Sequence, residues 1–145
     1  MNFEEHAAKP LLKAAGIAVP DGRLARTADD AAKAFDAIGP CIIKAQVPTG
    51  KRGKAGGIKT ADSADEARVA ADAILGMDIA GHTVEAVLVE GRSDIAREFY
   101  AAVLNDPSSK GPLVMFSTEG GMDIEEGAEN NPDAIRKAAA DIRAG

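Results

Sequence analysis

The chain has 145 residues, of which 46% are hydrophobic and only 3% aromatic, and it carries 23 acidic against 17 basic residues. This length fits one ordinary domain with a core built mainly from alanine, valine, isoleucine and leucine. Nucleic-acid backbones and anionic membranes attract proteins with a broad basic face, so the net charge of -6 argues against binding to nucleic acid or to a membrane.

The N-terminal residues and the cysteine content point to a cytoplasmic protein. Glu4 and Glu5 stand where a signal peptide needs a basic region, and no apolar run approaches membrane-spanning length. Cys41 is the only cysteine, so the chain cannot form an internal disulfide. Its position in an apolar run predicts a small buried side chain rather than a reactive thiol.

Two helices are expected in the first part of the chain. The first runs from about Phe3 to Ala15 with Asn2 as its cap, and Pro10 inside it predicts a kink or a late start. The second begins behind the cap Thr27, has acidic residues in its first turn, and runs to about Ile38.

A strand, a glycine-rich loop and a return strand follow. The strand covers Cys41–Val47, and the return strand begins at Ile58. A capping box at Ser63–Glu66 then opens a third helix, which ends at Gly76.

The remaining elements complete the expected fold class. Strands are predicted over Thr83–Val89 and Ile95–Asn105, and a segment dense in turn residues leads into a further strand at Leu113–Ser117. Pro132 and Asp133 open an alanine-rich helical tail. The alternation of helices and strands predicts an α/β (α+β) domain in which helices flank a mixed β-sheet.

The segment from Lys44 to Lys59 differs in charge from the rest of the chain. It holds five basic side chains and four glycines, and no Asp or Glu occurs between Asp36 and Asp62. Glycines let backbone N–H groups approach a ligand closely, and the basic side chains supply the charge that an anion needs. The segment therefore predicts a bound phosphate, with an exposed, solvated turn as the simpler alternative.

The spacing of this loop excludes two common phosphate motifs. No Gly-Lys pair is followed by Ser or Thr, as a Walker A motif requires, and glycines at 50, 53, 56 and 57 do not fit GxGxxG. The loop joins two strands of one hairpin instead. We expect it to lie over a nucleotide like a lid.

Two runs of residues indicate a particular protein family more specifically than the composition does. They are RGKAGGIK at Arg52–Lys59 and STEGG at Ser117–Gly121, and other matching residues are spread from Met1 to Glu125. With them, the whole chain resembles the N-terminal part of the β subunit of succinate-CoA ligase (ADP-forming), or of the related malate-CoA ligase, in the ATP-grasp superfamily.

The resemblance implies an ATP-grasp type lobe over residues 17–90, with a phosphate loop at residues 48–57. Residues 1–16 and 94–145 would begin a second lobe that is not complete at residue 145. The family's magnesium ligands and its CoA-ligase domain would lie beyond that residue, so neither catalytic residues nor metal ligands are expected within the chain. Alone, such a chain should be catalytically inert or nearly so.

The resemblance also implies a nucleotide site. The residues that match it are Lys44, Lys51, Arg52, Gly53, Glu90, Ser93 and Glu98. Lys44 would contact the ATP phosphates, and residues 51–53 would lie along the nucleotide. The segment from Glu90 to Ser93 would cross between the lobes past the adenine, and Glu98 would belong to the same site. Without the resemblance, Glu90 and Glu98 would be interpreted as solvated strand-edge carboxylates.

For a complete enzyme, the resemblance implies an acid-CoA ligase of the tricarboxylic acid cycle. ATP with Mg2+ would phosphorylate a histidine on a partner α subunit, and that phosphate would activate a dicarboxylic acid for attack by CoA. The chain would supply the ATP-binding portion. Succinate, malate or another acid as the substrate, and ATP or GTP as the nucleotide, stay open.

Two other interpretations remain at this level. The chain could be a catalytically inactive, stand-alone nucleotide-binding or interaction module that forms a homo-oligomer through apolar surface left uncovered by the missing lobe. It could also be a small anion-binding protein unrelated to ATP. Binding of MgATP would exclude the anion-binding protein. Association with an α subunit would distinguish the ligase β subunit from the stand-alone module.

Overall fold

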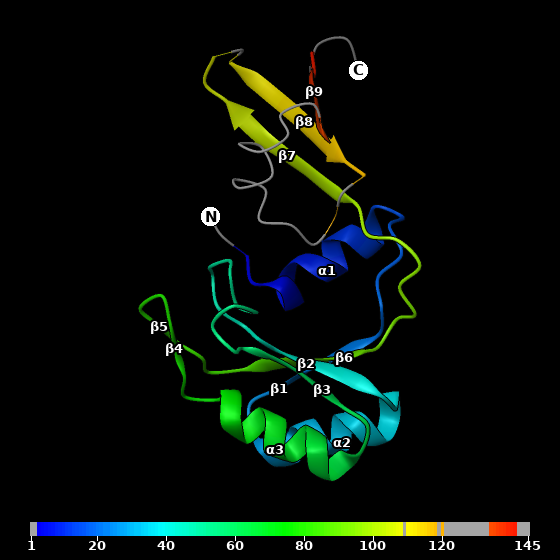
Figure 1. The fold of residues 1–145 in the computed structure, drawn as a ribbon, viewed down its shortest axis with the longest axis vertical. Coiled ribbons are helices and arrows are strands. Elements are labelled where there is room, and N and C mark those ends of the chain that lie inside the picture. The colour runs from blue at the N-terminus through cyan, green and yellow to red at the C-terminus, as the bar shows by residue number, and fades with distance from the viewer. Residues whose placement is uncertain (1–2, 109, 119, 121–133, 142–145) are drawn as a thin grey trace. The chain divides into compact units, whose positions relative to one another are not determined.

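The computed structural model describes residues 3–108, 110–118, 120 and 134–141. The chain divides into two compact units, Met1–Ser93 and Asp94–Gly145 (Figure 1). This division does not test the lobe boundaries implied by the resemblance, which stay a prediction. Within the described residues, no helix is both long enough and apolar enough to cross a bilayer.

The first unit is organised around a four-stranded sheet of order β1-β6-β2-β3. Its strands and the two helices between them are β1 (Gly22–Ala25), α2 (Ala28–Ile38), β2 (Cys41–Ala45), β3 (Ile58–Ala61), α3 (Ala64–Ile74) and β6 (Val87–Gly91). Each helix joins two strands that run parallel, but a strand of the other pair is inserted between them. β6 separates β1 from β2, and β2 separates β3 from β6.

This interleaving corrects one detail of the expected fold. The alternation of helix and strand predicts a mixed sheet, whereas every neighbouring pair in this sheet is antiparallel. The parallel pairs exist, as in other split βαβ arrangements, but they are not adjacent. The α/β (α+β) class with flanking helices is confirmed.

One face of the sheet packs against α2 and α3 (Figure 1). Thr27 caps α2 by accepting a hydrogen bond from the Asp30 backbone, and Ser63 caps α3 by accepting one from the Glu66 backbone, as predicted. Small side chains let the helices approach the sheet closely. The core on this face is mainly alanine and branched aliphatic residues: Ala31, Ala34, Ala67, Ala71, Ile74, Ile43, Val87 and Val89.

The helix α1 (Glu5–Ala14) lies on the opposite side of this sheet from α2 and α3 (Figure 1). It starts later than the expected Phe3 and contains Pro10 in its interior, which agrees with the expected late start. Its N-cap is Glu4, whose side chain makes no capping hydrogen bond, and the expected cap Asn2 lies outside the described residues. None of the ten side chains of α1 is buried, so apolar packing does not hold it as it holds α2 and α3.

A short hairpin lies between α3 and β6 and was not predicted from the sequence. Its strands are β4 (Asp78–Ile79) and β5 (His82–Thr83), and the turn residues Ala80 and Gly81 have φ values of 53° and 81°. Two positive φ values are typical of a type I′ turn, but alanine is an unusual residue at its first position. The strand expected over Thr83–Val89 therefore begins only at Val87.

The second unit contains a three-stranded antiparallel sheet of order β7-β8-β9. β7 (Tyr100–Asp106) and β8 (Gly111–Ser117) form the predicted hairpin, although β7 begins after the expected Ile95. The predicted helical tail is wrong, because β9 (Ile135–Ala139) pairs with five consecutive residues of β8. The hydrogen bonds of that ladder outweigh the local helix preference of alanine. The expected start of the tail, residues 132–133, lies outside the described residues.

Candidate functional site

Lys44 and Glu90 are neighbours on the face of the sheet that α1 covers. Side chains alternate across β2, so its odd-numbered residues enter the core and Lys44 points to the opposite face. β6 pairs with β2 so that Ile42 lies opposite Glu90, which makes Lys44 and Glu90 diagonal neighbours. The Lys44 Nζ donates a hydrogen bond of 2.6 Å to the Glu90 Oε1.

The helix α1 adds a carboxylate and an ammonium group one turn apart. The Lys9 Nζ lies 3.1 Å from the Glu5 Oε1 and also contacts the Glu90 Oε2. The Glu5 Oε1 in turn accepts a hydrogen bond of 3.1 Å from the Lys44 Nζ. The four side chains therefore form a closed ring in which positive and negative charges alternate.

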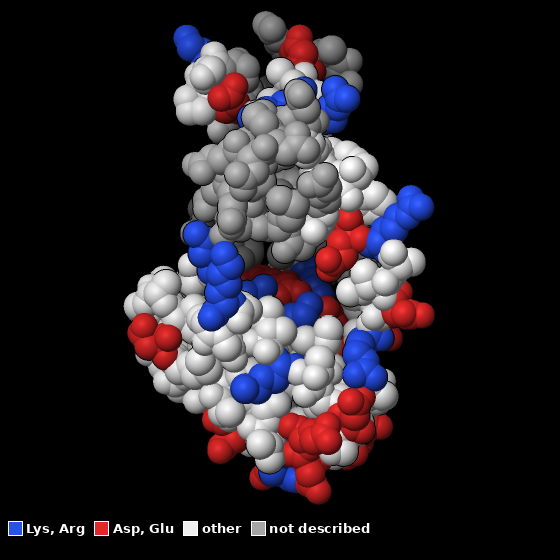
Figure 2. Space-filling model, viewed as in Figure 1, with Lys and Arg blue, Asp and Glu red and all other residues white. Residues whose placement is uncertain are grey.

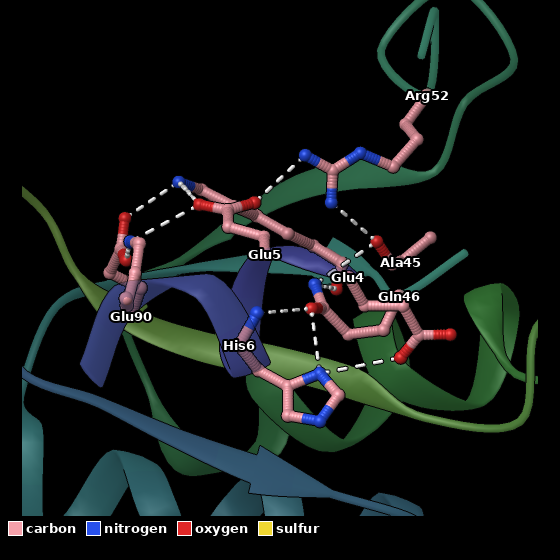
Figure 3. A network of polar contacts seen from close by, with 9 residues as sticks. Glu4, Glu5, His6, Ala45, Gln46, Arg52 and Glu90 are labelled. Carbon is pink, nitrogen blue, oxygen red and sulfur yellow. Dashed lines mark hydrogen bonds and ion pairs between the residues drawn. The ribbon is translucent and has the colours of Figure 1, made fainter. Parts of the chain in front are cut away.

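The glycine-rich loop brings Arg52 to the same place (Figure 3). Its Nη2 donates a hydrogen bond of 2.8 Å to the Glu5 Oε2, and its Nη1 donates one of 2.8 Å to the Ala45 carbonyl. The loop folds back tightly, since a Cβ on Gly57 would lie 3.0 Å from the Ala45 Cβ and 3.2 Å from the Arg52 carbonyl oxygen. We define the ion cluster as Glu5, Lys9, Lys44, Arg52 and Glu90.

The ion cluster is largely removed from solvent. The Glu90 side chain is 5% exposed, and the other four are between 17% and 20% exposed. Three cations face two carboxylates, which leaves one positive charge in excess. On the part of the face that Figure 2 shows in colour, basic side chains are scattered among acidic ones. These five poorly solvated side chains therefore carry a net positive charge, and such a charge attracts an anion more strongly there than it would in bulk water.

The charges of the cluster shift the pKa values of its members. Burial alone would raise the pKa of Glu5, but hydrogen bonds from Arg52, Lys44 and Lys9 and the charge of Lys44 lower it from 4.5 to about 2. Burial lowers the pKa of Lys9, and the charges of Lys44 and Arg52 lower it further against the opposing effect of Glu5. The Glu5 carboxylate is thus held in its charged form.

A second polar network, centred on Gln46, ties the first turn of α1 to the end of β2 (Figure 3). Gln46 is 2% exposed, and its Oε1 accepts a hydrogen bond of 2.9 Å from the His6 backbone N. Its Nε2 donates to the carbonyls of the two preceding residues, each at 3.1 Å. Because the Glu4 side chain does not cap α1, Gln46 satisfies one of the free N–H groups of that turn.

Of the site residues predicted from the sequence, Lys44, Arg52 and Glu90 meet in the ion cluster. Glu90 is 4% exposed, so the alternative of a solvated carboxylate is wrong for it. Lys51 and Gly53 flank Arg52 in the loop, and Lys51 has a φ of 60°. Their contact with a nucleotide stays a prediction.

The other two predicted residues, Ser93 and Glu98, lie outside the cluster's hydrogen-bonded side chains. Ser93 is the last residue of the first unit and lines a hollow of about 570 Å³ together with Arg92 and Gly22. Glu98 is exposed and belongs to the second unit, in the stretch before β7. Their roles at a nucleotide also stay predictions.

Glu5 and Lys9 are members of the ion cluster that were not predicted as site residues from the sequence. A Glu and a Lys four positions apart on a helix are an ordinary surface pair, so their spacing alone carries no functional signal. The signal that could have found them is Lys44 itself. A lysine that points away from the core beneath a covering helix needs a counter-charge, and α1 supplies it.

The donors of the cluster suit an anion. Lys44 and Arg52 offer N–H groups with positive charge, which bind phosphate or carboxylate oxygens. Within the part of the chain that the structure describes, no group of three or more His, Cys, Asp or Glu side chains could hold a metal ion. The geometry therefore defines a candidate anion site.

Comparison with known proteins defines the class of protein. The ATP-grasp domain family matches residues 2–145, and the chain belongs to this family. It is 53% identical over 142 residues to the β subunit of an ADP-forming succinate–CoA ligase from Halorubrum lacusprofundi, covering 97% of this chain and 37% of that protein. It is 48% identical over 138 residues to the β subunit of a GDP-forming succinate–CoA ligase from Thermus thermophilus, covering 94% and 36%.

The resemblance noted in the sequence is therefore confirmed, and the chain spans little more than a third of the length of these curated relatives. Solved structures agree on the fold. The dinucleotide-forming acetyl-coenzyme A synthetase 1 of Ca. Korarchaeum cryptofilum, with coenzyme A and Ca-AMPCP, matches with a TM-score of 0.79 and 28% identity over 96% of this chain and 60% of that chain. PH1788 from Pyrococcus horikoshii matches with a TM-score of 0.73 and 25% identity over 97% and 60%.

Proposed function

We propose that this chain is the ATP-binding portion of the β subunit of an ADP-forming acid-CoA ligase of the succinate-CoA ligase type. The observation that carries the proposal is the convergence of Lys44 and Arg52, from β2 and from the loop behind it, on the carboxylate of Glu5. Two cations that share a carboxylate are spaced to share a phosphate group, because both anions accept charge-assisted hydrogen bonds from them. The similarity to the β subunits of two succinate–CoA ligases supports the same function.

Different residues would contact different parts of the nucleotide. Lys44 and Arg52 would bind the phosphates, with Lys51 and Gly53 alongside in the loop. The segment at residues 90–93 would pass the adenine, and Glu98 would accept hydrogen bonds from the ribose hydroxyls. Buried Glu90 contacts two lysines of the cluster, so we assign it the further role of fixing their positions.

In the complete ligase, the bound ATP would phosphorylate a histidine of the partner α subunit in the cytoplasm, and the phosphate would then activate a dicarboxylic acid for attack by CoA. Phosphoryl transfer depends on positioning and on neutralisation of the developing charge. This chain would contribute the positioning, by holding the phosphates between β2 and the loop. Mg2+ bound with ATP would supply further neutralisation, through ligands outside the described residues.

Calorimetric titration of the purified chain with MgATP tests the proposal. The unmodified chain should bind, and Lys44→Met and Arg52→Gln should each weaken binding by about tenfold or more, which is ~1.4 kcal/mol. Lys59→Met is the matched control, because Lys59 is an exposed lysine on the neighbouring strand β3 and outside the ion cluster. Absence of binding by the unmodified chain, or equal binding by all four proteins, would refute the nucleotide site.

A second experiment tests the partner. The chain is co-expressed with the α subunit of a succinate-CoA ligase, and co-purification is followed by size-exclusion chromatography with light scattering. We expect a complex of the two. MgATP binding without such a complex would instead support an inactive nucleotide-binding module, and the measured mass would show whether that module forms a homo-oligomer.

A further inference from the structure

The proposed phosphate site already contains an anion of the protein itself. Both oxygens of the Glu5 carboxylate are used there: Oε1 accepts from the Lys44 Nζ at 3.1 Å and Oε2 accepts from the Arg52 Nη2 at 2.8 Å. These are the two cations assigned above to the ATP phosphates. A phosphate group can therefore take both hydrogen bonds only after Glu5 has given them up.

The two carboxylates of the ion cluster differ in how firmly they are held. Glu90 lies on β6, a central strand of the sheet, and its side chain is 5% exposed. Glu5 lies on α1, none of whose side chains is buried, and its own side chain is 20% exposed. Moving Glu90 would disturb the sheet, whereas moving Glu5 requires only the exchange of polar contacts. Of the two, Glu5 is the carboxylate that a ligand can replace.

We propose that Glu5 is a built-in counter-ion that occupies the place of a phosphate group between Lys44 and Arg52, and that a nucleoside polyphosphate binds by displacing it. This inference rests on the nucleotide site proposed above. Without a ligand, Glu5 keeps two poorly solvated cations paired, which avoids the cost of burying an unpaired charge. With a ligand, the phosphate takes over that pairing.

The exchange has a consequence for ligand choice. Displacement breaks the hydrogen bonds that Glu5 makes with Lys44 and Arg52. An incoming anion must therefore form stronger interactions with these two cations than a carboxylate does. A polyphosphate brings several charged oxygens and meets that condition, whereas a single weakly bound anion does not. After release, Glu5 retains the neighbouring Lys9, four positions along the same helix, as a partner. Glu5 would therefore favour polyphosphates over small anions.

Substitution of Glu5 tests the inference by calorimetric titration with MgATP. Glu5→Gln removes the competing charge and should lower the Kd by about tenfold, the effect of ~1.4 kcal/mol. Glu5→Asp keeps the charge but has a shorter side chain that cannot bridge both cations, so it should also bind more tightly than the unmodified chain. Glu4→Gln is the matched control, since Glu4 precedes Glu5 and contacts His6 rather than the ion cluster, and its Kd should stay unchanged.

The outcomes separate the inference from the proposed function. If no variant and no unmodified chain binds MgATP, the nucleotide site itself is refuted, and this inference with it. If the unmodified chain binds and Glu5→Gln binds equally or less tightly, Glu5 positions the cations instead of competing, and only the inference fails. If Glu5→Gln binds MgATP more tightly and Glu5→Asp does not, the effect comes from the net charge alone and not from displacement of a bridging carboxylate. That result would also overturn the inference.

A measurement on the unmodified chain covers the case in which the variants do not fold, as judged by circular dichroism. The carboxyl ¹³C signal of Glu5 is followed by NMR at constant pH as MgATP is added. Displacement moves this carboxylate away from Lys44 and Arg52, so its signal should shift in step with saturation. A Glu5 signal that does not move when other signals of the chain report saturation would overturn the inference.

Discussion

The two faces of the four-stranded sheet use different kinds of interaction to hold their helices. On one face, α2 and α3 have capped N-termini and bury alanines against Ile43 and Val89. On the other face, α1 has no side-chain cap of its own and buries no side chain. Its contacts there include the ion cluster and the hydrogen bonds of Gln46.

The difference follows from the alternation of side chains along a strand. It places the residues that stabilise the fold on one face of the sheet and the charged residues of the candidate site on the other. Neighbouring residues of β2, Ile43 and Lys44, point to opposite faces, so one short segment serves both. Apolar packing loses its value when a helix moves away, because the surface returns to water. A charged side chain can exchange one oppositely charged partner for another with little net change in free energy. The charged face is thus suited to exchange a ligand, and the apolar face to keep the fold.

The largest expected effect separates the two faces directly. Ile43→Ala removes a fully buried side chain from the core, and it should lower the free energy of unfolding by about 4 kcal/mol. Ile42→Ala, one residue earlier and pointing to the α1 face, is the matched control and should cost roughly half as much, since its side chain is only partly buried. Urea unfolding followed by circular dichroism measures both values. Equal losses would show that the faces are packed alike.

Acid should weaken the charged face through protonation of Glu5. The folded-state pKa of Glu5 is about 2, below the ordinary value of 4.5, so its contribution to stability is complete above about pH 4.5 and is lost as the pH falls toward 2. Allowing for its partial exposure, we expect a loss of about 2 kcal/mol that is absent in Glu5→Gln. Urea midpoints between pH 6 and pH 2.5 measure it. The same pH dependence in both proteins would contradict the assignment.

The smallest expected effect concerns the helix caps. Ser63→Ala removes the hydrogen bond to the Glu66 backbone and should destabilise the first unit by about 1 kcal/mol. Glu4→Ala, at the corresponding position of α1, should cost less than about 0.5 kcal/mol, because the Glu4 side chain makes no capping bond. Thermal unfolding of the two variants gives the comparison. A larger loss for Glu4→Ala would mean that α1 depends on its own cap after all.

Local signals were predictable from the sequence because a few neighbouring residues determine them. Thr27 and Ser63 cap their helices as expected, since a cap needs only a hydroxyl and the next turn. The turn residues after Asn105 correctly marked the hairpin of β7 and β8. The family was identified from the specific residue runs around Arg52 and Ser117. The alternation of helices and strands and the composition of the chain could not identify it.

The features that were missed depend on contacts between distant residues. The insertion of β6 between β1 and β2 leaves no local trace, because the alternation of helix and strand does not encode the order of strands. The pairing of β9 with β8 likewise overrode the helical pattern around Ala138. Glu5 was missed as a site residue because its contact in the ion cluster is with Lys44, 39 positions away.

The position of β6 also determines the order in which this unit can assemble. In a growing chain, β1 and β2 are made early, but the strand that pairs with both comes last of the four. Until then their inner edges remain open, and Lys44 lacks Glu90, which follows it by 46 residues. Long-range closure of this kind slows folding. Completion of the sheet, and with it the ion pair between Lys44 and Glu90, therefore comes late in biosynthesis.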